Sequence, residues 1–309
     1  MTYQFHPPTN SALRDKVVVL TGGAAGIGAA AVRLLHEAGA HVFFGDVLDD
    51  AGRALEQELT YGATVKFVHC DVTSYRDNLA LFDIAFKSFG RIDHAWANAG
   101  IVEQGNIFDP KLSLEGVKEE PSKSLSVVDV NLKGPIYFAR IAAVYLRQGS
   151  QQSDRSLTLT SSVGGFREDP GLWVYVPAKH GVLGLMRMLQ DPLSKASPKI
   201  RTNAICPWAT KTHMFEGNEE QWTAAGLPAN SPDDVARIVV GVLADSKVSG
   251  GTIYIEGGRA WDIEAGLLKT RPQWLGERQT ADLDGGTQVL GGGEGWTAGQ
   301  KDSPVKSKL

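Results

Sequence analysis

Short apolar runs alternate with helix-favouring segments along most of this chain. Apolar runs of this length, bounded by glycine or polar residues, are typical of buried parallel strands. Their alternation with helical stretches predicts an α/β fold, with a doubly wound parallel sheet flanked by helices. The predicted strands are Lys16–Leu20, Ala40–Asp46, Val65–Asp71, Ile92–Asn98, Ser156–Ser161, Ile200–Cys206 and Thr252–Glu256.

A glycine-rich turn follows the first predicted strand and leads into the helix-favouring segment Ala29–Ala38. Gly22, Gly26 and Gly28 let the backbone turn sharply and approach a pyrophosphate closely. The pyrophosphate would lie at the N-terminus of the following helix, where backbone N–H groups lack partners. Strand, glycine turn and helix together predict a Rossmann-type dinucleotide fold.

The second predicted strand ends in an acid, Asp46, which lies eighteen residues beyond Gly28. This spacing suits a carboxylate that binds the ribose hydroxyls of the adenosine half. A carboxylate there repels a 2′-phosphate, and no Arg or Lys occurs between residues 22 and 32 to attract one. The pattern therefore predicts NAD over NADP, the alternative being an aspartate that only ends the strand.

Tyr175, Lys179 and Ser162 form a candidate proton-transfer group. Residues i and i+4 share one helix face, so the Lys179 ammonium can lie beside the Tyr175 phenol. A nearby cation favours the phenolate and should lower the pKa of the tyrosine. A tuned phenol can exchange a proton with an alcohol or a carbonyl, and the Ser162 hydroxyl can hold the reacting oxygen. The alternative is a surface helix pair.

With these motifs, the chain resembles the short-chain dehydrogenase/reductase family over about residues 15–262, and most closely the fungal members of secondary metabolism. The resemblance implies a Rossmann-type single catalytic domain that binds NAD and carries out redox chemistry on an alcohol or ketone. The matching segments, in family order, are Thr21–Gly28, Asp71-Val72, Asn98-Ala99-Gly100, Asn131, Ser162, Tyr175–Lys179 and Asn203–Pro207.

The resemblance also assigns roles to single residues. Asn131 would bind, through its backbone, a water that links Lys179 to solvent in a proton relay, and Thr212 would contact the nicotinamide carboxamide. Asp71 would bind the adenine amino group. The cofactor-binding residues implied in this way are Gly22, Gly26, Ile27, Gly28, Asp46, Asp71, Val72, Asn98, Ala99, Gly100, Tyr175, Lys179, Pro207 and Thr212. The catalytic residues implied are Asn131, Ser162, Tyr175 and Lys179.

Three features depart from the family pattern. Trp208 stands where the family has glycine, and it either shapes the pocket or turns outward. Pro177 lies between Tyr175 and Lys179, which a helix tolerates only within its first turn. The connection from Asn98 to Asn131 is long, so we expect an insertion around Asn106–Ser124.

The segment between Thr212 and Pro228 is expected to cover the substrate. Aromatic and apolar side chains in and near it predict a hydrophobic, even polycyclic, alcohol or ketone, although about half of them could simply pack in the core. The rival functions are a peroxisomal 3-hydroxyacyl-CoA dehydrogenase and a NAD-binding scaffold with a non-redox cyclase or isomerase role. The candidate substrate residues are Phe166, Trp173, Trp208, Met214, Phe215 and Trp222.

Composition limits the classes of partner and ligand that we expect for this protein. The chain has 309 residues, 42% of them hydrophobic, and a net charge of −4 without a basic block, which argues against a nucleic-acid partner. Cys70 and Cys206 fall in predicted strands and are expected to be buried, reduced thiols. The scattered histidines predict no metal site. No apolar stretch is long enough to cross a membrane, and no signal peptide is evident.

The domain limits expected from these patterns are an N-terminal arm (1–14), the catalytic domain (15–262) and a C-terminal extension (263–309). Seven glycines between residues 285 and 299 favour an irregular segment there. The terminal Ser307-Lys308-Leu309 matches a peroxisomal address, which predicts an import receptor as a partner and otherwise a cytoplasmic location. From the family resemblance we also expect a homodimer or homotetramer through the helices Leu125–Leu146 and Tyr175–Leu193.

Overall fold

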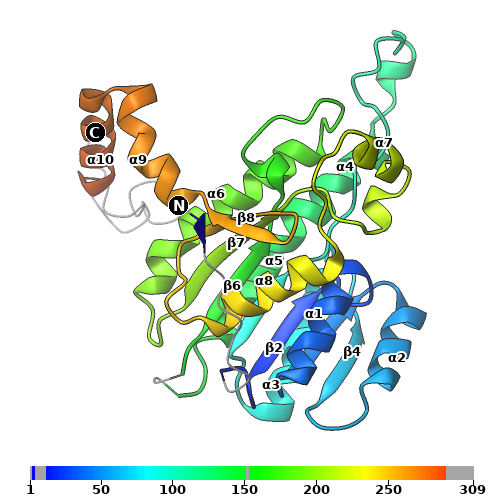
Figure 1. Cartoon of the computed structure of the whole chain (residues 1–309), viewed down its shortest axis with the longest axis vertical. Helices are drawn as coiled ribbons and strands as arrows, with labels where there is room; N and C mark the ends of the chain where they lie inside the picture. Colours follow the sequence, from blue (N-terminus) through cyan, green and yellow to red (C-terminus); the bar gives the residue numbers. More distant parts are fainter. Residues whose placement is uncertain (1, 4–11, 151–152, 290–309) are drawn as a thin grey trace, which may run out of the picture. The chain divides into compact units, whose positions relative to one another are not determined.

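The computed structural model describes residues 2–3, 12–150 and 153–289, and divides the chain into two compact units, Met1–Asp262 and Ile263–Leu309. The first unit is built on one nine-stranded sheet with the order β1-β9-β8-β7-β6-β5-β2-β3-β4 (Figure 1). All pairings from β4 to β8 are parallel, whereas β9 and β1 join antiparallel at one edge. The expected Rossmann-type doubly wound sheet is confirmed.

The seven predicted strands all form, with ends that differ from the prediction by at most two residues. They are β2 (Val17–Thr21), β3 (His41–Asp46), β4 (Val65–His69), β5 (His94–Ala97), β6 (Ser156–Thr160), β7 (Arg201–Pro207) and β8 (Thr252–Glu256). The strand order reverses between β2 and β5, and ligands of doubly wound sheets bind at such a switch point, beyond the carboxyl ends of the strands. The loops that follow β2, β3, β5, β6 and β7 carry most of the candidate residues.

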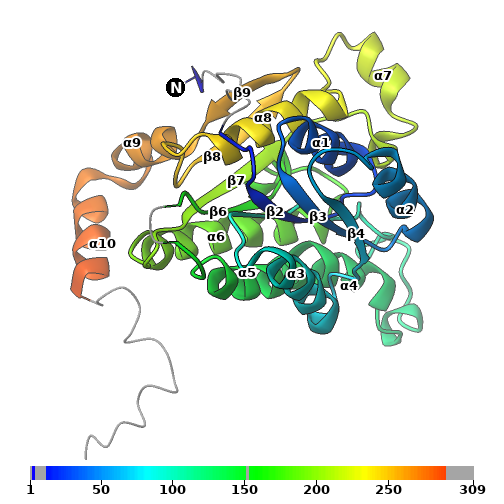
Figure 2. The same cartoon turned by 90° about the horizontal axis from the view of Figure 1, so that it is seen from below.

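Helices cover both faces of the sheet (Figure 2). α1 (Gly26–Glu37) and α8 (Pro232–Ala244) pack together on one face, while α3 (Tyr75–Phe89), α5 (Gly134–Tyr145) and α6 (Tyr175–Ser194) cover the other. Each face closes its own apolar core, and Trp96 of β5 is fully buried in the core beneath α1 and α8. The shorter helices are α2 (Asp49–Glu58), α4 (Ser122–Val128), α7 (Glu219–Ala224) and the 3-10 turns η1 (Gly116–Lys118), η3 (Val163–Gly165) and η4 (His213–Phe215).

The helix expected over Leu125–Leu146 is not continuous. It is interrupted by a π-helical turn, η2 (Asp129–Lys133), between α4 and α5. Single π turns inside α-helices are rare and often lie at functional sites, and Asn131 stands in the middle of this one. The expected helix Tyr175–Leu193 is confirmed as α6, which ends one residue later.

Two short edge strands were not predicted. β9 (Arg259–Asp262) pairs with β8, and β1 (Thr2–Tyr3) pairs with β9, inside the stretch expected to be an irregular arm. Such brief pairings depend on partners far away in the sequence and leave little local signal. The long connection after β5 does form a largely exposed loop with only η1 and α4 before Asn131, as expected from its length.

The second unit contains α9 (Glu264–Leu275) and α10 (Glu277–Val289), which contact each other and are joined by an ion pair between Arg271 and Asp284. The prediction of irregular structure was therefore wrong for Gly285 and Gly286, which lie inside α10. The remaining glycines of that stretch and Ser307–Leu309 lie outside the described residues. Within the described part of the chain, no helix is long and apolar enough to span a bilayer.

Candidate active site

The glycine turn lies at the switch point of the sheet and is held from the neighbouring strand. The side-chain amide of Asn98, just beyond β5, donates to the carbonyl of Gly22 at 3.0 Å. Gly22 has φ +67°, a conformation that favours glycine. A Cβ atom on Gly28 would lie 1.8 Å from the Gly22 carbonyl oxygen, so no larger residue fits there. The predicted approach of backbone to ligand is thus built into the turn.

Asp46, at the end of β3, reaches the same turn. One carboxylate oxygen accepts the backbone N–H of Ala24 at 3.0 Å, and the other accepts that of Leu48 at 3.1 Å. The first turn of α1 itself carries no acidic residue. A backbone cradle that excludes a Cβ atom, followed by an acid at the next strand end, fits a dinucleotide pyrophosphate and its ribose.

Two further predicted cofactor residues follow β4. Asp71 accepts hydrogen bonds from the backbone N–H of Thr73 at 2.9 Å and from its hydroxyl at 2.8 Å. Val72 is buried, and a Cβ atom on Gly134, at the start of α5, would lie 3.0 Å from its side chain. Both residues therefore line the part of the sheet edge beside Asp46, with their positions fixed by local turns and packing.

The three proton-transfer candidates come together, as predicted. Ser162 follows β6, and Tyr175 is the first residue of α6. A Cβ atom on Gly164 would lie 3.8 Å from Oγ of Ser162 and 3.7 Å from Cε1 of Tyr175, so the hydroxyl and the ring lie together there. The Nζ atom of Lys179 lies 5.5 Å from the Tyr175 ring centroid and donates to the carbonyl of Thr160 at 3.1 Å. Pro177 is the third residue of α6, in the first turn, where its missing N–H costs no helical hydrogen bond.

The electrostatics of this group differ from the expectation. Burial lowers the pKa of Lys179 to about 8, because the charged ammonium loses water. Burial also raises the pKa of the Tyr175 phenol, and the hydrogen bond from Ser162 only partly offsets this. The predicted lowering of the tyrosine pKa was therefore wrong for this structure. Desolvation outweighs a cation that is itself buried and readily loses its proton.

Asn131 sits next to this group, in the π-helical turn η2, and it is fully buried. Its side-chain carbonyl accepts the N–H of Ile101 at 2.8 Å, and its amide donates to the Ile101 carbonyl at 2.8 Å. A Cβ atom on Gly100 would lie 3.1 Å from Oδ1 of Asn131 and 3.4 Å from Nζ of Lys179. Asn131 and Lys179 thus both lie against Gly100.

The loop after β7 returns to the glycine turn. Pro207 ends the strand, and Thr212 follows it closely. A Cβ atom on Gly26 would lie 3.2 Å from the methyl group of Thr212, so the Thr212 side chain lies against the glycine turn. Its hydroxyl donates to the carbonyl of Thr210 at 3.3 Å.

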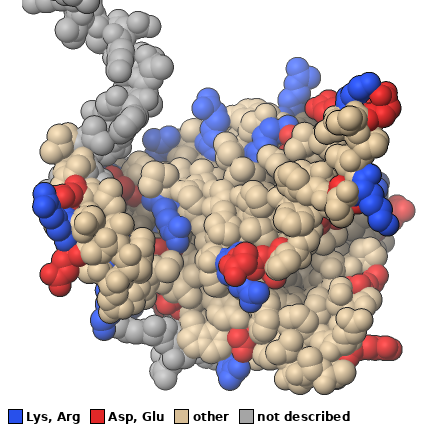
Figure 3. All heavy atoms as spheres, turned by 90° about the horizontal axis from the view of Figure 1, so that it is seen from above, with Lys and Arg blue, Asp and Glu red and all other residues tan. Residues whose placement is uncertain are grey.

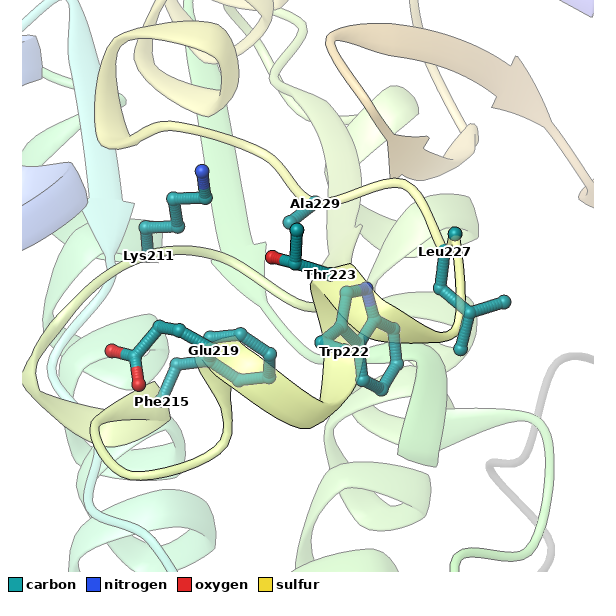
Figure 4. Close-up of a pocket in the computed structure, with 8 residues that line it drawn as sticks. Lys211, Phe215, Glu219, Trp222, Thr223, Leu227 and Ala229 are labelled. Carbon is teal, nitrogen blue, oxygen red and sulfur yellow. The ribbon is translucent and has the colours of Figure 1, made fainter.

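The expected cover, Thr212–Pro228, folds into η4 and α7 and carries an aromatic cluster. The ring of Trp222 packs edge-on against Trp208 at 4.9 Å and against Phe215 at 5.4 Å, measured between centroids. Trp208 is therefore turned towards the cover. Phe215 and Trp222 line a pocket of about 340 Å³ (Figure 4).

Two of the remaining substrate candidates lie elsewhere. Trp173, 44% exposed, packs against Phe108 of the long loop at 5.5 Å between ring centroids. Phe166 packs against Tyr254 of β8 at 5.8 Å and joins the apolar core beneath α6. Met214 precedes Phe215 in η4 and is 46% exposed. The structure thus brings Phe215, Trp222 and Trp208 together, whereas Trp173 and Phe166 pack against other residues.

Several residues of this region were not found from the sequence. Lys211 and Glu219 line the same pocket as Phe215 (Figure 4). Asn230 is fully buried at the end of the cover, where its amide donates to the carbonyls of Ala209 and Ile255, both at 3.2 Å. A polar residue in a loop gives no sequence signal that it will anchor two strand ends.

The two cysteines are free and buried, as predicted, although Cys70 lies one residue beyond β4.

On the face shown in Figure 3, uncharged side chains dominate, and Lys or Arg residues are interspersed with Asp and Glu. Among the described residues, no group of three or more His, Cys, Asp or Glu side chains is placed to hold a metal ion.

Comparisons with known proteins agree with this geometry. A model of the family described as short chain dehydrogenase matches residues 16–222. The short-chain dehydrogenase/reductase ascJ of Acremonium egyptiacum is 35% identical, over 84% of both chains. (+)-Borneol dehydrogenase 1 of Salvia officinalis is 32% identical, over 80% of this chain and 94% of its own.

A solved structure of the same fold is also similar to this chain. The crystal structure of levodione reductase superposes with a TM-score of 0.68 at 27% sequence identity, covering 79% of this chain and 97% of that one. A sheet with this switch point, a glycine turn beside it and a Ser–Tyr–Lys group beyond β6 accompany the match to the family model. The chain belongs to the short-chain dehydrogenase family.

Proposed function

We propose that this protein is an NAD-dependent oxidoreductase that interconverts a secondary alcohol and a ketone on a hydrophobic small molecule. The observation that carries the proposal is that the Ser162 hydroxyl and the Tyr175 ring meet beside Gly164, with the buried Lys179 ammonium 5.5 Å from the ring centroid. A hydroxyl that fixes an oxygen, next to a phenol that exchanges its proton, suits reversible carbonyl chemistry.

Ser162, Tyr175 and Lys179 each have a separate role in the proposed reaction. Ser162 holds the substrate oxygen, and Tyr175 takes its proton in oxidation or supplies one in reduction. Lys179, 5.5 Å from the centroid of the phenol ring, exchanges the proton with solvent through a water that the backbone of Asn131 would hold. A bound nicotinamide dinucleotide would accept or donate the hydride, and its positive oxidised ring would favour the phenolate. The phosphates would be held by the turn at Gly22–Gly28.

The preference for NAD over NADP rests on Asp46. Its carboxylate is fixed at the glycine turn by Ala24 and Leu48, so a 2′-phosphate there would meet a negative charge. We expect Asp46→Asn, which keeps an acceptor oxygen but removes the charge, to raise the NADP-to-NAD ratio of kcat/KM by about 10- to 100-fold. Asp49→Asn, an exposed change on α2, is the matched control. An unchanged ratio in Asp46→Asn would exclude the ribose role.

A hydrophobic substrate is supported by the aromatic cover. Trp222 packs against both Trp208 and Phe215, so the cover offers a ligand a cluster of aromatic rings beside the charged side chains of Lys211 and Glu219. The relative from Salvia officinalis is named for borneol, a compact bicyclic secondary alcohol. We therefore propose cyclic alcohols and their ketones as the substrate class.

The test is NADH absorbance against a panel of cyclic and linear secondary alcohols and ketones that includes borneol and camphor. We expect turnover with cyclic members, and a loss of about 10²- to 10⁴-fold in kcat for Tyr175→Phe while NADH still binds by fluorescence. Tyr61→Phe, at a phenol on an exposed loop, is the control. Retained activity in Tyr175→Phe would refute the assignment.

A homo-oligomer is also proposed. The helices expected to form the interface expose apolar side chains, with Ile136 43%, Val144 48% and Met188 73% accessible. Exposed apolar residues on neighbouring helices support a contact between copies.

A further inference from the structure

The helix that carries Tyr175 has no cap of its own. Its N-cap residue is Val174, whose side chain cannot accept a hydrogen bond. The N–H of Val176 bonds to the carbonyl of Leu172 at 3.1 Å, and Pro177 has no N–H. The N–H groups of Val174 and Tyr175 remain as the orphan donors of the first turn, and a helix end this close to the core requires acceptors for them.

Glu103 supplies those acceptors from a distant loop. Its carboxylate accepts the N–H of Tyr175 at 2.8 Å, and both of its oxygens lie within hydrogen-bond distance of the N–H of Val174, at 3.1 and 3.2 Å. The three bonds are charge-assisted, and the negative charge lies at the positive end of the helix dipole. The backbone of Tyr175 is thus held directly by a side chain more than seventy positions earlier in the chain.

The loop that carries Glu103 is tied to the rest of the active site. The side-chain amide of Asn98 donates to the carbonyl of Gly22 in the glycine turn. The N–H and the carbonyl of Ile101 are both hydrogen-bonded to the side chain of Asn131. Only one residue separates Ile101 from Glu103. This short segment therefore connects the glycine turn, the π-helical turn and the catalytic helix through consecutive hydrogen bonds.

We infer that Glu103 is a positioning residue that sets the location of Tyr175 relative to the glycine turn. The inference rests on the proposed role of Tyr175. Because the carboxylate bonds to the backbone of Tyr175 itself, any change in its length or acceptor capacity moves the phenol relative to Ser162 and to the bound dinucleotide. A displacement of about 1 Å at a reacting group can reduce a rate by about 100-fold.

A purely structural cap would act differently. It would lower stability without changing the chemistry, because the folded molecules that remain would hold the phenol in its normal place. The conservative variant Glu103→Gln separates the two, since its amide oxygen can still accept these N–H groups although the charge is lost. Glu103→Asp keeps the charge on a shorter arm that cannot reach both donors in the same way.

The experiment compares Glu103→Ala, Glu103→Gln and Glu103→Asp with wild type and with Glu115→Gln. Glu115 lies on the same loop, and its ion pair with Lys118 is exposed. Turnover is measured with NAD and borneol, together with the panel member that wild type oxidises fastest. Backbone amide exchange at Val174 and Tyr175 is followed by NMR, which needs no substrate.

Glu103→Ala is expected to speed amide exchange at Val174 and Tyr175 selectively and to lower kcat by about 10- to 100-fold, with the KM for NAD within about twofold. Glu103→Gln should recover most of kcat, Glu103→Asp less, and the control should match wild type. Wild-type kcat in folded Glu103→Ala or Glu103→Asp, or exchange that does not change, overturns the inference. An active Tyr175→Phe protein would instead overturn the proposed function, whatever the Glu103 variants do.

Discussion

At the scale of single residues, burial of Lys179 in the active site carries an electrostatic cost. The side chain is 3% exposed, and burial lowers its pKa to about 8 from the usual 10.5. The unfolded chain therefore binds more protons than the folded protein between about pH 8 and 10.5. Stability rises with pH across this window, and below pH 8 the full penalty for burying the charge is present.

Lys179→Met removes this penalty, so we expect the variant to be more stable than wild type by about 1–3 kcal/mol at pH 7 and to lose that advantage towards pH 10.5. Urea unfolding at both pH values measures the difference. Lys195→Met, at an exposed ion pair just after α6, should show no such pH dependence. A Lys179→Met protein that is less stable at pH 7 would mean that the bond to the Thr160 carbonyl outweighs desolvation.

At the scale of elements, the strands and α6 were predictable because burial on both faces imposes long apolar runs, and a tyrosine and lysine four apart need a helix. Other features depend on contacts with residues far away in the sequence, which the local pattern cannot predict. Asn131 in a π-helical turn, Glu103 capping α6, and the pairing of Thr2–Tyr3 with β9 are of this kind. The pKa of Tyr175 also escaped prediction, since its direction depends on burial.

Asn131, in the π-helical turn, is expected to affect both stability and activity. The side chain of Asn131 is hydrogen-bonded to both the N–H and the carbonyl of Ile101. The side chain of Asn203, near the start of β7, likewise accepts the N–H of Gly251 and donates to the carbonyl of Val248. Asn131→Ala and Asn203→Ala should each cost about 1–3 kcal/mol, because each removes two hydrogen bonds to backbone groups, although the Val248 carbonyl keeps its bond from Arg201. Only Asn131→Ala should lower kcat, by about tenfold or more, since Asn131 and Lys179 both lie against Gly100.

Urea unfolding and NADH absorbance on the two proteins separate stability from activity. Equal losses of kcat in both variants would show that activity simply follows stability, and would remove Asn131 from the proposed relay.

At the scale of the whole molecule, the sheet joins parts of the chain that are far apart in sequence into one buried layer. Cys70 follows β4 at one edge, and Cys206 lies in β7 on the other side of the switch point, yet both belong to the same apolar core. The alternation of strands and helices predicted this layering, and the family pattern predicted which strand ends meet. The two cysteines can therefore report whether that layer opens as a unit.

Burial raises the pKa of both Cys70 and Cys206 to about 12, so only about one thiol in 10⁴ is ionised at pH 8, and neither is accessible. We expect no reaction of the native protein with a disulfide reagent at pH 8 on a scale of minutes. In increasing urea, both thiols should become reactive together, with the same midpoint as the loss of far-UV circular dichroism. A thiol that reacts in native buffer, or two separate midpoints, would show that one edge of the sheet opens independently of the core.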